Sequence, residues 1–392
     1  MRLSRYYHFI LSALSLFSCS EKEYDSCAVT LRLTLPEDYT ELPLEEMKVT
    51  LTNRDQGNSY MANFSSDGIT VMNVEYGYYT ASVHYQTASG LIFSGRLEPL
   101  ALLPGQNEYT AMIQLSRSQT NALVIKEIYY GGCIGAYGSG YQADQYVTLY
   151  NNSDETIYLD GLCLAVVDPA SNLESPWMRE TDMSRIPIND LTWQFPGNGK
   201  QYPLAPSAET TIATNAVDHT GGDYQHDNSV NLSKVDWGFW NVTLKRQTIT
   251  PGVKPLNLLL NLNPSLIMYS FPPKGPAFMV FGIQGIPAET YVNDPTNRAP
   301  RPLSSNNNKT YLMIPKQWVI DCVECVENTK QLAFKRVPND LDNGVAYIPN
   351  SPFTGQSLIR KSKVDETGRI IYQDTNNSTE DLIVSSPSLK NR

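Results

Sequence analysis

The sequence predicts an all-β protein built from two β-sandwich domains, and three observations support this fold class. Apolar and polar residues alternate in short runs such as 29–35, which gives a strand one face for a core and one for water. Clusters of turn-forming residues separate these runs. The 392 residues include 24 Tyr, 24 Gly and 25 Pro but only 18% charged residues. This composition favours strands and turns over helices.

Residues 1–18 are typical of a bacterial lipoprotein signal peptide. Arg2 and Arg5 precede an apolar stretch that is too short to span a bilayer, and Cys19 follows it. The residues before Cys19 resemble the lipobox, although Phe17 is bulkier than usual there. The resemblance implies that residues 1–18 are removed and that Cys19 is acylated, which anchors the mature chain in a membrane.

Residues 19–26 form a short acidic tether before the first domain. Ser20-Glu21-Lys22-Glu23 resembles the export tag of Bacteroidetes lipoproteins that are displayed on the outer face of the outer membrane. The resemblance implies an outer-membrane, lipid-anchored protein that faces the cell exterior. A solvated tether without a sorting role is the alternative, and it leaves open whether the anchor faces the periplasm or the exterior.

The first predicted domain covers residues 27–117. Four alternating runs predict strands, and Gly-containing turns such as 55–58 and 66–68 separate them. The order of these strands and the length of the segment resemble the immunoglobulin-like or transthyretin-like modules found near lipoprotein N-termini. The resemblance implies a β-sandwich that acts as a stalk.

The polar residues 116–120 predict a linker, and residues 121–392 form the second domain. Its apolar strand patterns lie at both ends of the domain, at 123–130, 145–153 and 356–361. These patterns, an Asp160-Gly161 turn and the polar segment 374–381 resemble the lamin-tail family. The resemblance implies an immunoglobulin-like sandwich with a large insertion at about 168–310. The pairing of the two modules resembles uncharacterised Bacteroidetes surface lipoproteins, which are often encoded beside outer-membrane transporters.

The charge of the chain excludes some functions. The net charge is −10, and removal of Arg2 and Arg5 with the signal peptide makes it more negative. Nucleic-acid binding depends on clustered Lys and Arg, so we expect no nucleic-acid partner.

The apparent cofactor and metal motifs lack the required surroundings. Gly138 to Ala143 fits a dinucleotide glycine pattern, but a strand rather than a helix follows it. Cys322-Val323-Glu324-Cys325 has the spacing of half a zinc site without a second half. His219 and His226 lie with several Asp residues in 218–227, where solvated loop residues are the alternative to a metal site. We therefore expect no cofactor and no bound metal.

The sequence leaves the pairing of five cysteines open: Cys27, Cys133, Cys163, Cys322 and Cys325. A local bridge between Cys322 and Cys325 would require a bulge or turn, because strand residues three apart face opposite sides.

Aromatic residues in the insertion are the candidate ligand-binding residues. Trp177, Trp237, Phe239 and Trp240 lie among loop-forming residues, and exposed rings of this kind stack on sugars or other flat ligands. Burial of the same rings in a core is the alternative interpretation.

These observations predict a non-catalytic binding or accessory module for nutrient uptake or attachment. An outer-membrane transporter and a carbohydrate or other small ligand are the candidate partners. No nucleophile elbow, His-Glu-x-x-His or phosphate-binding loop occurs in the chain. A hydrolase with its site in the insertion and a purely structural surface component are the two alternatives. The sequence identifies neither the ligand nor the partner protein nor the oligomeric state.

Overall fold

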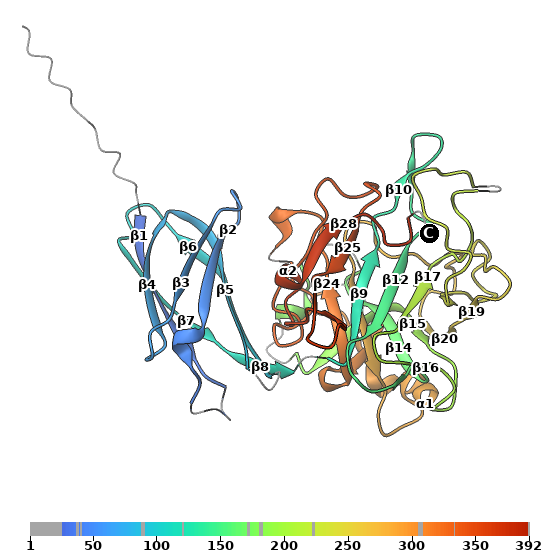
Figure 1. Ribbon diagram of the computed structural model, residues 1–392, viewed down its shortest axis with the longest axis horizontal. Helices are drawn as coiled ribbons and strands as arrows, with labels where there is room; N and C mark the ends of the chain where they lie inside the picture. Colours follow the sequence, from blue (N-terminus) through green and yellow to red (C-terminus); the bar gives the residue numbers. More distant parts are fainter. Residues whose placement is uncertain are drawn as a thin grey trace, which may run out of the picture.

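The computed structural model describes residues 26–36, 39, 41–87, 91–119, 121–170, 173–179, 183–221, 224–304, 309–332 and 334–390. They form two lobes that lie side by side along the long axis of the molecule (Figure 1). Strands dominate both lobes and the helices are short, which confirms the predicted all-β class. None of the helices in these ranges has the length and apolar character that a membrane crossing requires. Cys19 and the predicted signal peptide lie outside the described residues.

The N-terminal lobe packs a three-stranded sheet against a five-stranded sheet. The first has the order β4-β1-β7, with β1 (Ser26–Thr34), β4 (Ile69–Glu75) and β7 (Glu108–Gln114). The second has the order β3-β2-β5-β6-β8, with β2 (Lys48–Asn53), β3 (Ser59–Asn63), β5 (Gly77–Gln86), β6 (Leu91–Leu102) and β8 (Ser116–Gln119). A 3-10 turn, η1 (Leu44–Glu46), precedes β2.

The alternation of residue types positions the core of this lobe. Val29 and Leu31 of β1 are fully buried, whereas Arg32 is exposed. The buried side chains of both sheets meet in one hydrophobic cluster, because alternate residues of a strand face the same side.

The C-terminal lobe contains two seven-stranded sheets. The first has the order β19-β18-β17-β12-β9-β25-β28, with β9 (Leu123–Tyr129), β12 (Tyr146–Asn151), β17 (Glu209–Ala213), β18 (Trp237–Gly238), β19 (Lys254–Pro255), β25 (Ser357–Arg360) and β28 (Leu382–Ser385). The second has the order β22-β23-β15-β14-β21-β24, with β20 also paired to β15. Its strands are β14 (Leu162–Val167), β15 (Arg185–Gln194), β20 (Asn257–Asn261), β21 (Ala277–Gly282), β22 (Arg298–Pro300), β23 (Thr310–Pro315) and β24 (Val319–Glu324).

The C-terminal lobe also contains short strand pairs and short helical segments outside these two sheets. Three two-stranded pairs are β10 (Cys133–Ile134) with β11 (Gly140–Tyr141), β13 (Ile157–Tyr158) with β16 (Pro203–Leu204), and β26 (Ser362–Val364) with β27 (Ile370–Tyr372). The helical segments are η2 (Trp177–Arg179), α1 (Ala288–Asn293), η3 (Pro295–Asn297), η4 (Lys316–Trp318), η5 (Thr329–Gln331) and α2 (Ser378–Asp381).

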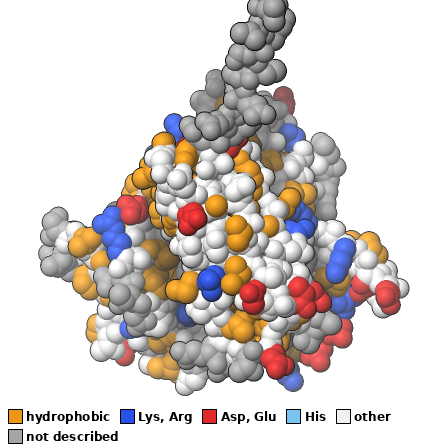
Figure 2. Space-filling model, turned by 90° about the vertical axis from the view of Figure 1, so that its left-hand side faces the viewer, with side chains coloured by type: hydrophobic (Ala, Val, Ile, Leu, Met, Phe, Trp, Pro, Cys, Tyr) orange, Lys and Arg blue, Asp and Glu red, His pale blue; other side chains and the backbone are white. Residues whose placement is uncertain are grey.

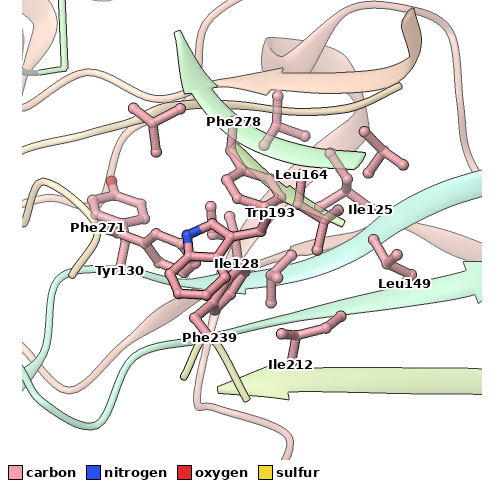
Figure 3. Close-up of a cluster of buried hydrophobic side chains, with 14 of the residues drawn as sticks. Ile125, Ile128, Tyr130, Leu149, Leu164, Trp193, Ile212, Phe239, Phe271 and Phe278 are labelled. Atoms are coloured by element: carbon pink, nitrogen blue, oxygen red, sulfur yellow. The ribbon is translucent and has the colours of Figure 1, made fainter. Parts of the chain in front are cut away.

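Large aromatic and aliphatic side chains fill the space between the two sheets of the C-terminal lobe. Figure 3 shows Trp193, Phe239, Phe271 and Phe278 gathered around the middle of this core, with aliphatic side chains from β9 and β12. Trp193 and Phe239 make edge-to-face contact, with ring centroids 5.6 Å apart.

The structure adds detail to two predicted segments. The polar residues Ser116–Gln119 pair with Leu91–Ser94 of β6 as an edge strand. Edge pairing uses backbone groups and requires no apolar sequence, so composition alone does not reveal it. Within the segment 168–310, β15, β17 and β21 occupy interior positions of both sheets, and the description of this segment as an insertion stays a prediction. The exact domain boundaries stay a prediction.

The lobes contact each other through the five-stranded sheet of the N-terminal lobe. The Asn343 side-chain amide donates to Gly95 O at 3.0 Å, and Arg96 Nη1 donates to Asn343 O at 3.1 Å. The three-stranded sheet faces away from the C-terminal lobe (Figure 1). On that side, hydrophobic side chains lie scattered among uncharged ones (Figure 2), and Val71 and Met112 are among the exposed residues. Such single exposed side chains are ordinary for a soluble surface.

Candidate functional site

The four aromatic residues predicted to bind a ligand do not form an exposed platform. The exposed fractions of Trp177, Trp237 and Phe239 are 4%, 3% and 0%. Trp240 is half-buried, and its indole Nε1 donates to Gln247 O at 3.2 Å. The core alternative therefore describes three of the four rings.

Packing explains why these rings are buried. Trp237 lies against the rings of Phe195 and Tyr202, with centroid distances of 5.1 and 4.9 Å. The indole Nε1 of Trp177 donates to the buried Asp168 Oδ2 at 2.8 Å, so this polar atom is satisfied inside the protein. Each ring contributes apolar burial to the sandwich, which a loop-rich sequence around the ring does not reveal.

The structure brings together two segments that are about 80 positions apart in the sequence, around Tyr141 and His219. The glycine-rich residues 131–140 lie against the loop that contains His219 and His226. The Tyr141 ring contacts the His226 ring in a tilted arrangement, with ring centroids 3.9 Å apart and an interplanar angle of 40°. The Tyr141 hydroxyl lies 2.6 Å from His219 Nδ1, and His219 Nε2 lies 2.9 Å from Asn215 O. Since a carbonyl only accepts, Nε2 donates to it and Nδ1 accepts from the tyrosine.

Close packing explains the glycines of this segment. Gly132 has a φ of 68°, and a Cβ there would lie 2.1 Å from Tyr141 O. A Cβ on Gly140 would lie 2.5 Å from the ring of Phe353. Gly132 therefore requires glycine for its positive φ, and Gly140 requires it because the Phe353 ring leaves no room for a Cβ. A dinucleotide site requires a helix directly after the glycine-rich turn, but strand β12 follows this segment.

A buried carboxylate lies beneath the same hairpin. Asp144 Oδ2 accepts hydrogen bonds from Tyr129 at 3.0 Å, Ser229 at 2.6 Å and the Cys133 thiol at 3.4 Å. Both Asp144 and His219 are fully buried. The hydrogen bonds connect β9, β10 and the 215–229 loop, so this network fixes the base of the hairpin.

The protonation states of the network do not favour catalysis. Burial lowers the pKa of His219, so its imidazole is neutral at neutral pH. Burial also raises the pKa of the Tyr141 hydroxyl, and burial together with the Asp144 charge raises the pKa of the Cys133 thiol to about 12. A nucleophile needs a lowered pKa or an adjacent base in reach of substrate. These groups brace a loop, and they are not activated for reaction.

The described residues hold no group of three or more His, Cys, Asp or Glu that could bind a metal ion. His219 and His226 both contact the ring of Tyr141, while Asp223 lies outside the described residues. All five cysteines in the described part of the chain are buried and free. Cys322 and Cys325 belong to different hydrophobic clusters, as expected for strand residues three apart.

The tip of the β10–β11 hairpin is the most exposed aromatic feature of the described residues. The exposed fraction of Tyr137 is 94%, and that of Ile134 in β10 is 44%. His226 Nδ1 accepts a hydrogen bond from the backbone N–H of Ala136 at 2.9 Å, next to the tip. Figure 1 shows this hairpin projecting from one end of the C-terminal lobe.

A buried charge cluster in the C-terminal lobe was not predicted from the sequence. Arg360 Nη2 donates to both oxygens of Asp321 at 2.9 Å, and Nη1 donates to Asp381 Oδ2 at 3.1 Å. Asp374 Oδ1 lies 3.3 Å from the same Nη1. Charged residues directly after the apolar pairs 319–320 and 358–359 are the signal that would have revealed this cluster.

Comparison with known proteins adds a family resemblance. The family model for a protein of unknown function, DUF4876, matches residues 205–388. This match covers strands from both sheets of the C-terminal lobe and includes the buried charge cluster.

A solved structure extends the likeness to both lobes. The crystal structure of a DUF4876 family protein from Bacteroides thetaiotaomicron is similar, with a TM-score of 0.62 and 27% sequence identity. The match covers 91% of this chain and 94% of that chain, which neither lobe could provide alone. No curated protein matches. The likeness agrees with the uncharacterised Bacteroidetes family suggested by the sequence, while lipidation and the lamin-tail resemblance stay predictions.

Proposed function

We propose that the protein is a lipid-anchored outer-membrane module that binds a protein partner through the β10–β11 hairpin and performs no reaction of its own. The observation that supports this proposal most is the almost fully exposed Tyr137 ring at the tip of a braced hairpin. The partner class is an outer-membrane protein that serves nutrient uptake or attachment, and a transporter is the first candidate.

A braced aromatic tip suits protein recognition for physical reasons. Tyrosine offers a large contact area with few rotatable bonds and is enriched at interface hot spots. The tip is held by the hydrogen bond from Ala136 N to His226 and by the tilted contact between the Tyr141 and His226 rings. A loop that is ordered before binding loses less conformational entropy on association, so more of the contact energy appears as affinity.

The predicted anchor would keep the protein near the membrane surface. Ser26, the first residue of β1, follows Cys19 by seven residues, which span at most about 25 Å when extended. A lipid on Cys19 would therefore hold the N-terminal lobe close to the bilayer. A partner in the same membrane would then lie within reach of the C-terminal lobe.

The hydrolase alternative finds less support among the described residues. Its best candidate groups, Asp144 and His219, are fully buried and bonded to neighbouring side chains or backbone. A hydrolytic site requires titratable groups that meet a substrate in an open cleft.

Site-specific photocrosslinking tests the proposal in intact cells. A photoreactive phenylalanine analogue replaces Tyr137 in one strain and Tyr158 in a matched control strain. Tyr158 is exposed on β13, which pairs with β16 at another end of the lobe (Figure 1). We expect position 137 to give one discrete adduct with an outer-membrane protein and position 158 to give none. Equal labelling at both positions, or no adduct at 137, would argue against a hairpin interface.

A further inference from the structure

A cavity of about 340 Å³ opens where the two lobes meet. One wall comes from β5 of the N-terminal lobe, and the others come from the β26–β27 hairpin and the residues that follow it. The lining residues are His84, Ser362, Lys363, Ile371, Tyr372, Gln373, Asp374 and Thr375. Contacts between the lobes at Gly95, Arg96 and Asn343 fix the positions of these walls.

We propose that this cavity binds one neutral, hydroxyl-rich ring of monosaccharide size. The proposal concerns a small ligand at a different place from the hairpin, so it does not depend on the protein partner proposed above. Small-molecule sites often lie between domains, and their usual volumes begin near 300 Å³. A cavity of this size can enclose a single sugar ring, but it is too small to enclose a long oligosaccharide.

The cavity offers hydrogen-bonding groups of both kinds. His84 lines the cavity, and its neutral imidazole carries one donor and one acceptor nitrogen. The Gln373 side-chain amide group donates to Glu380 O and Asp381 Oδ1, and these bonds orient the side chain at the cavity wall. Ser362 and Lys363 supply exposed donors at the rim. A hydroxyl group is both donor and acceptor, so a polyol can satisfy such a mixed set.

The charges around the cavity favour a neutral ligand. Asp374 is its buried anion, and it already has Arg360 at 3.3 Å and a hydrogen bond from Asn121 N at 2.9 Å. Burial lowers the pKa of His84 to about 4, even though the Asp374 charge opposes this shift, so the imidazole is uncharged at neutral pH. Lys363 is exposed, and water and salt screen its charge. The Asp374 carboxylate is thus engaged by groups of the protein, and among the described residues no cationic side chain other than the exposed Lys363 lines the cavity to attract an anion.

The cavity also has an apolar side. Ile371 and Tyr372 of β27 line it, and Tyr372 is held in place by edge-to-face packing on Tyr150, with centroids 4.7 Å apart. Sugar rings present C–H groups between their hydroxyls, and these groups pack on aliphatic and aromatic surfaces. The combination of polar and apolar walls therefore fits a sugar better than it fits a small ion.

Saturation-transfer NMR with free monosaccharides tests the proposal. The panel contains glucose, galactose, mannose, xylose, fucose and N-acetylglucosamine, with ethanolamine and acetate as charged probes. We expect at least one sugar to receive saturation from the wild-type protein, and neither charged probe. The imidazole resonances of His84 should shift when that sugar is added, while those of His219 and His226 should stay in place.

A matched pair of variants locates the binding. Ser362→Trp places a large ring at the cavity rim, whereas Glu366→Trp places the same ring in the exposed turn of the same hairpin. We expect Ser362→Trp to weaken sugar binding at least tenfold and Glu366→Trp to change it less than twofold. Thermal unfolding checks that both variants fold. Binding of a charged probe only, no sugar binding to the wild type, or sugar binding that survives Ser362→Trp without a His84 shift would overturn the proposal.

Discussion

Replacement of Arg360 by methionine tests whether the buried charge cluster holds the C-terminal lobe together. Arg360 is almost fully buried and faces three carboxylates, those of Asp321, Asp374 and Asp381. Its Nε also donates to Ile125 O at 2.9 Å, which ties β25 to β9. Methionine keeps much of the side-chain volume but leaves these carboxylates without their cation.

The expected cost follows from the desolvation of the carboxylates. Burial raises the pKa of Asp321 to about 7 and that of Asp381 to about 6, in each case despite the attraction of Arg360. Removal of one partner from a buried ion pair typically costs about 3–5 kcal/mol. We therefore expect Arg360→Met to lower the free energy of unfolding by about 4 kcal/mol at pH 8.

The pH dependence of this loss has a defined sign. A carboxyl whose pKa is raised on folding adds stability that is fully present below its unfolded pKa, near 3.8, and is lost as the pH rises through its folded pKa. Loss of Arg360 raises the folded pKa of Asp321 and Asp381 further. The destabilisation should consequently be smaller at pH 5, where these carboxyls are protonated in the variant, than at pH 8.

Urea unfolding followed by tryptophan fluorescence at pH 5 and pH 8 measures both effects. Arg369→Met is the matched control, because Arg369 forms a partly exposed ion pair with Asp365 at 3.6 Å. Such a pair is worth about 1 kcal/mol or less. A cost for Arg360→Met that is as small as that of the control, or an equal cost at the two pH values, would show that the buried charge cluster does not stabilise the lobe.

Four further predictions concern the anchor, the lobes, metal content and acid stability. Cys19→Ala should release the protein from the membrane fraction after a salt wash, and retention there would contradict the anchor. Residues 121–392 should unfold cooperatively without the N-terminal lobe, because the lobes have separate hydrophobic clusters, and a non-cooperative melt by calorimetry would argue for a shared core. Elemental analysis of the purified protein should find no stoichiometric zinc or iron, whereas one tightly held ion per chain would overturn this expectation. A His whose pKa is lowered on folding stabilises the protein above pH 6.5 and loses this contribution as the pH falls toward 4. His84→Gln should therefore remove an acid-induced loss of folding free energy of up to about 3 kcal/mol. Identical unfolding curves of variant and wild type at pH 4.5 would contradict this prediction.

Local patterns in the sequence predicted much of the strand content. The alternation in 29–35 predicts β1, and the apolar runs 123–130 and 145–153 predict β9 and β12, because side chains of a strand alternate between core and solvent. The pairing of strands was not predictable from these patterns. The strands within 168–310 take interior places in both sheets through contacts between residues far apart in the chain, which no local pattern records.

The candidate sites show the same limit. Trp237 and Phe239 stand out in the sequence, but only the packing of Phe195, Tyr202 and Trp193 around them reveals that they are buried. His84 gives no signal in the sequence. The other residues that line its cavity begin at Ser362, which is about 280 positions later in the chain. Side chains that become a site through long-range contacts are visible only in the folded chain.

The proposed partner of Tyr137 is a protein of the outer membrane. Once crosslinking has identified that protein, the affinity of the purified pair, measured with wild-type and Tyr137→Ala chains, decides whether Tyr137 contacts it. We predict a rise in Kd of at least tenfold, since truncation of an aromatic hot spot costs about 2 kcal/mol or more. Tyr158→Ala should leave the Kd unchanged. An unchanged Kd for Tyr137→Ala would show that the hairpin tip is not the binding surface.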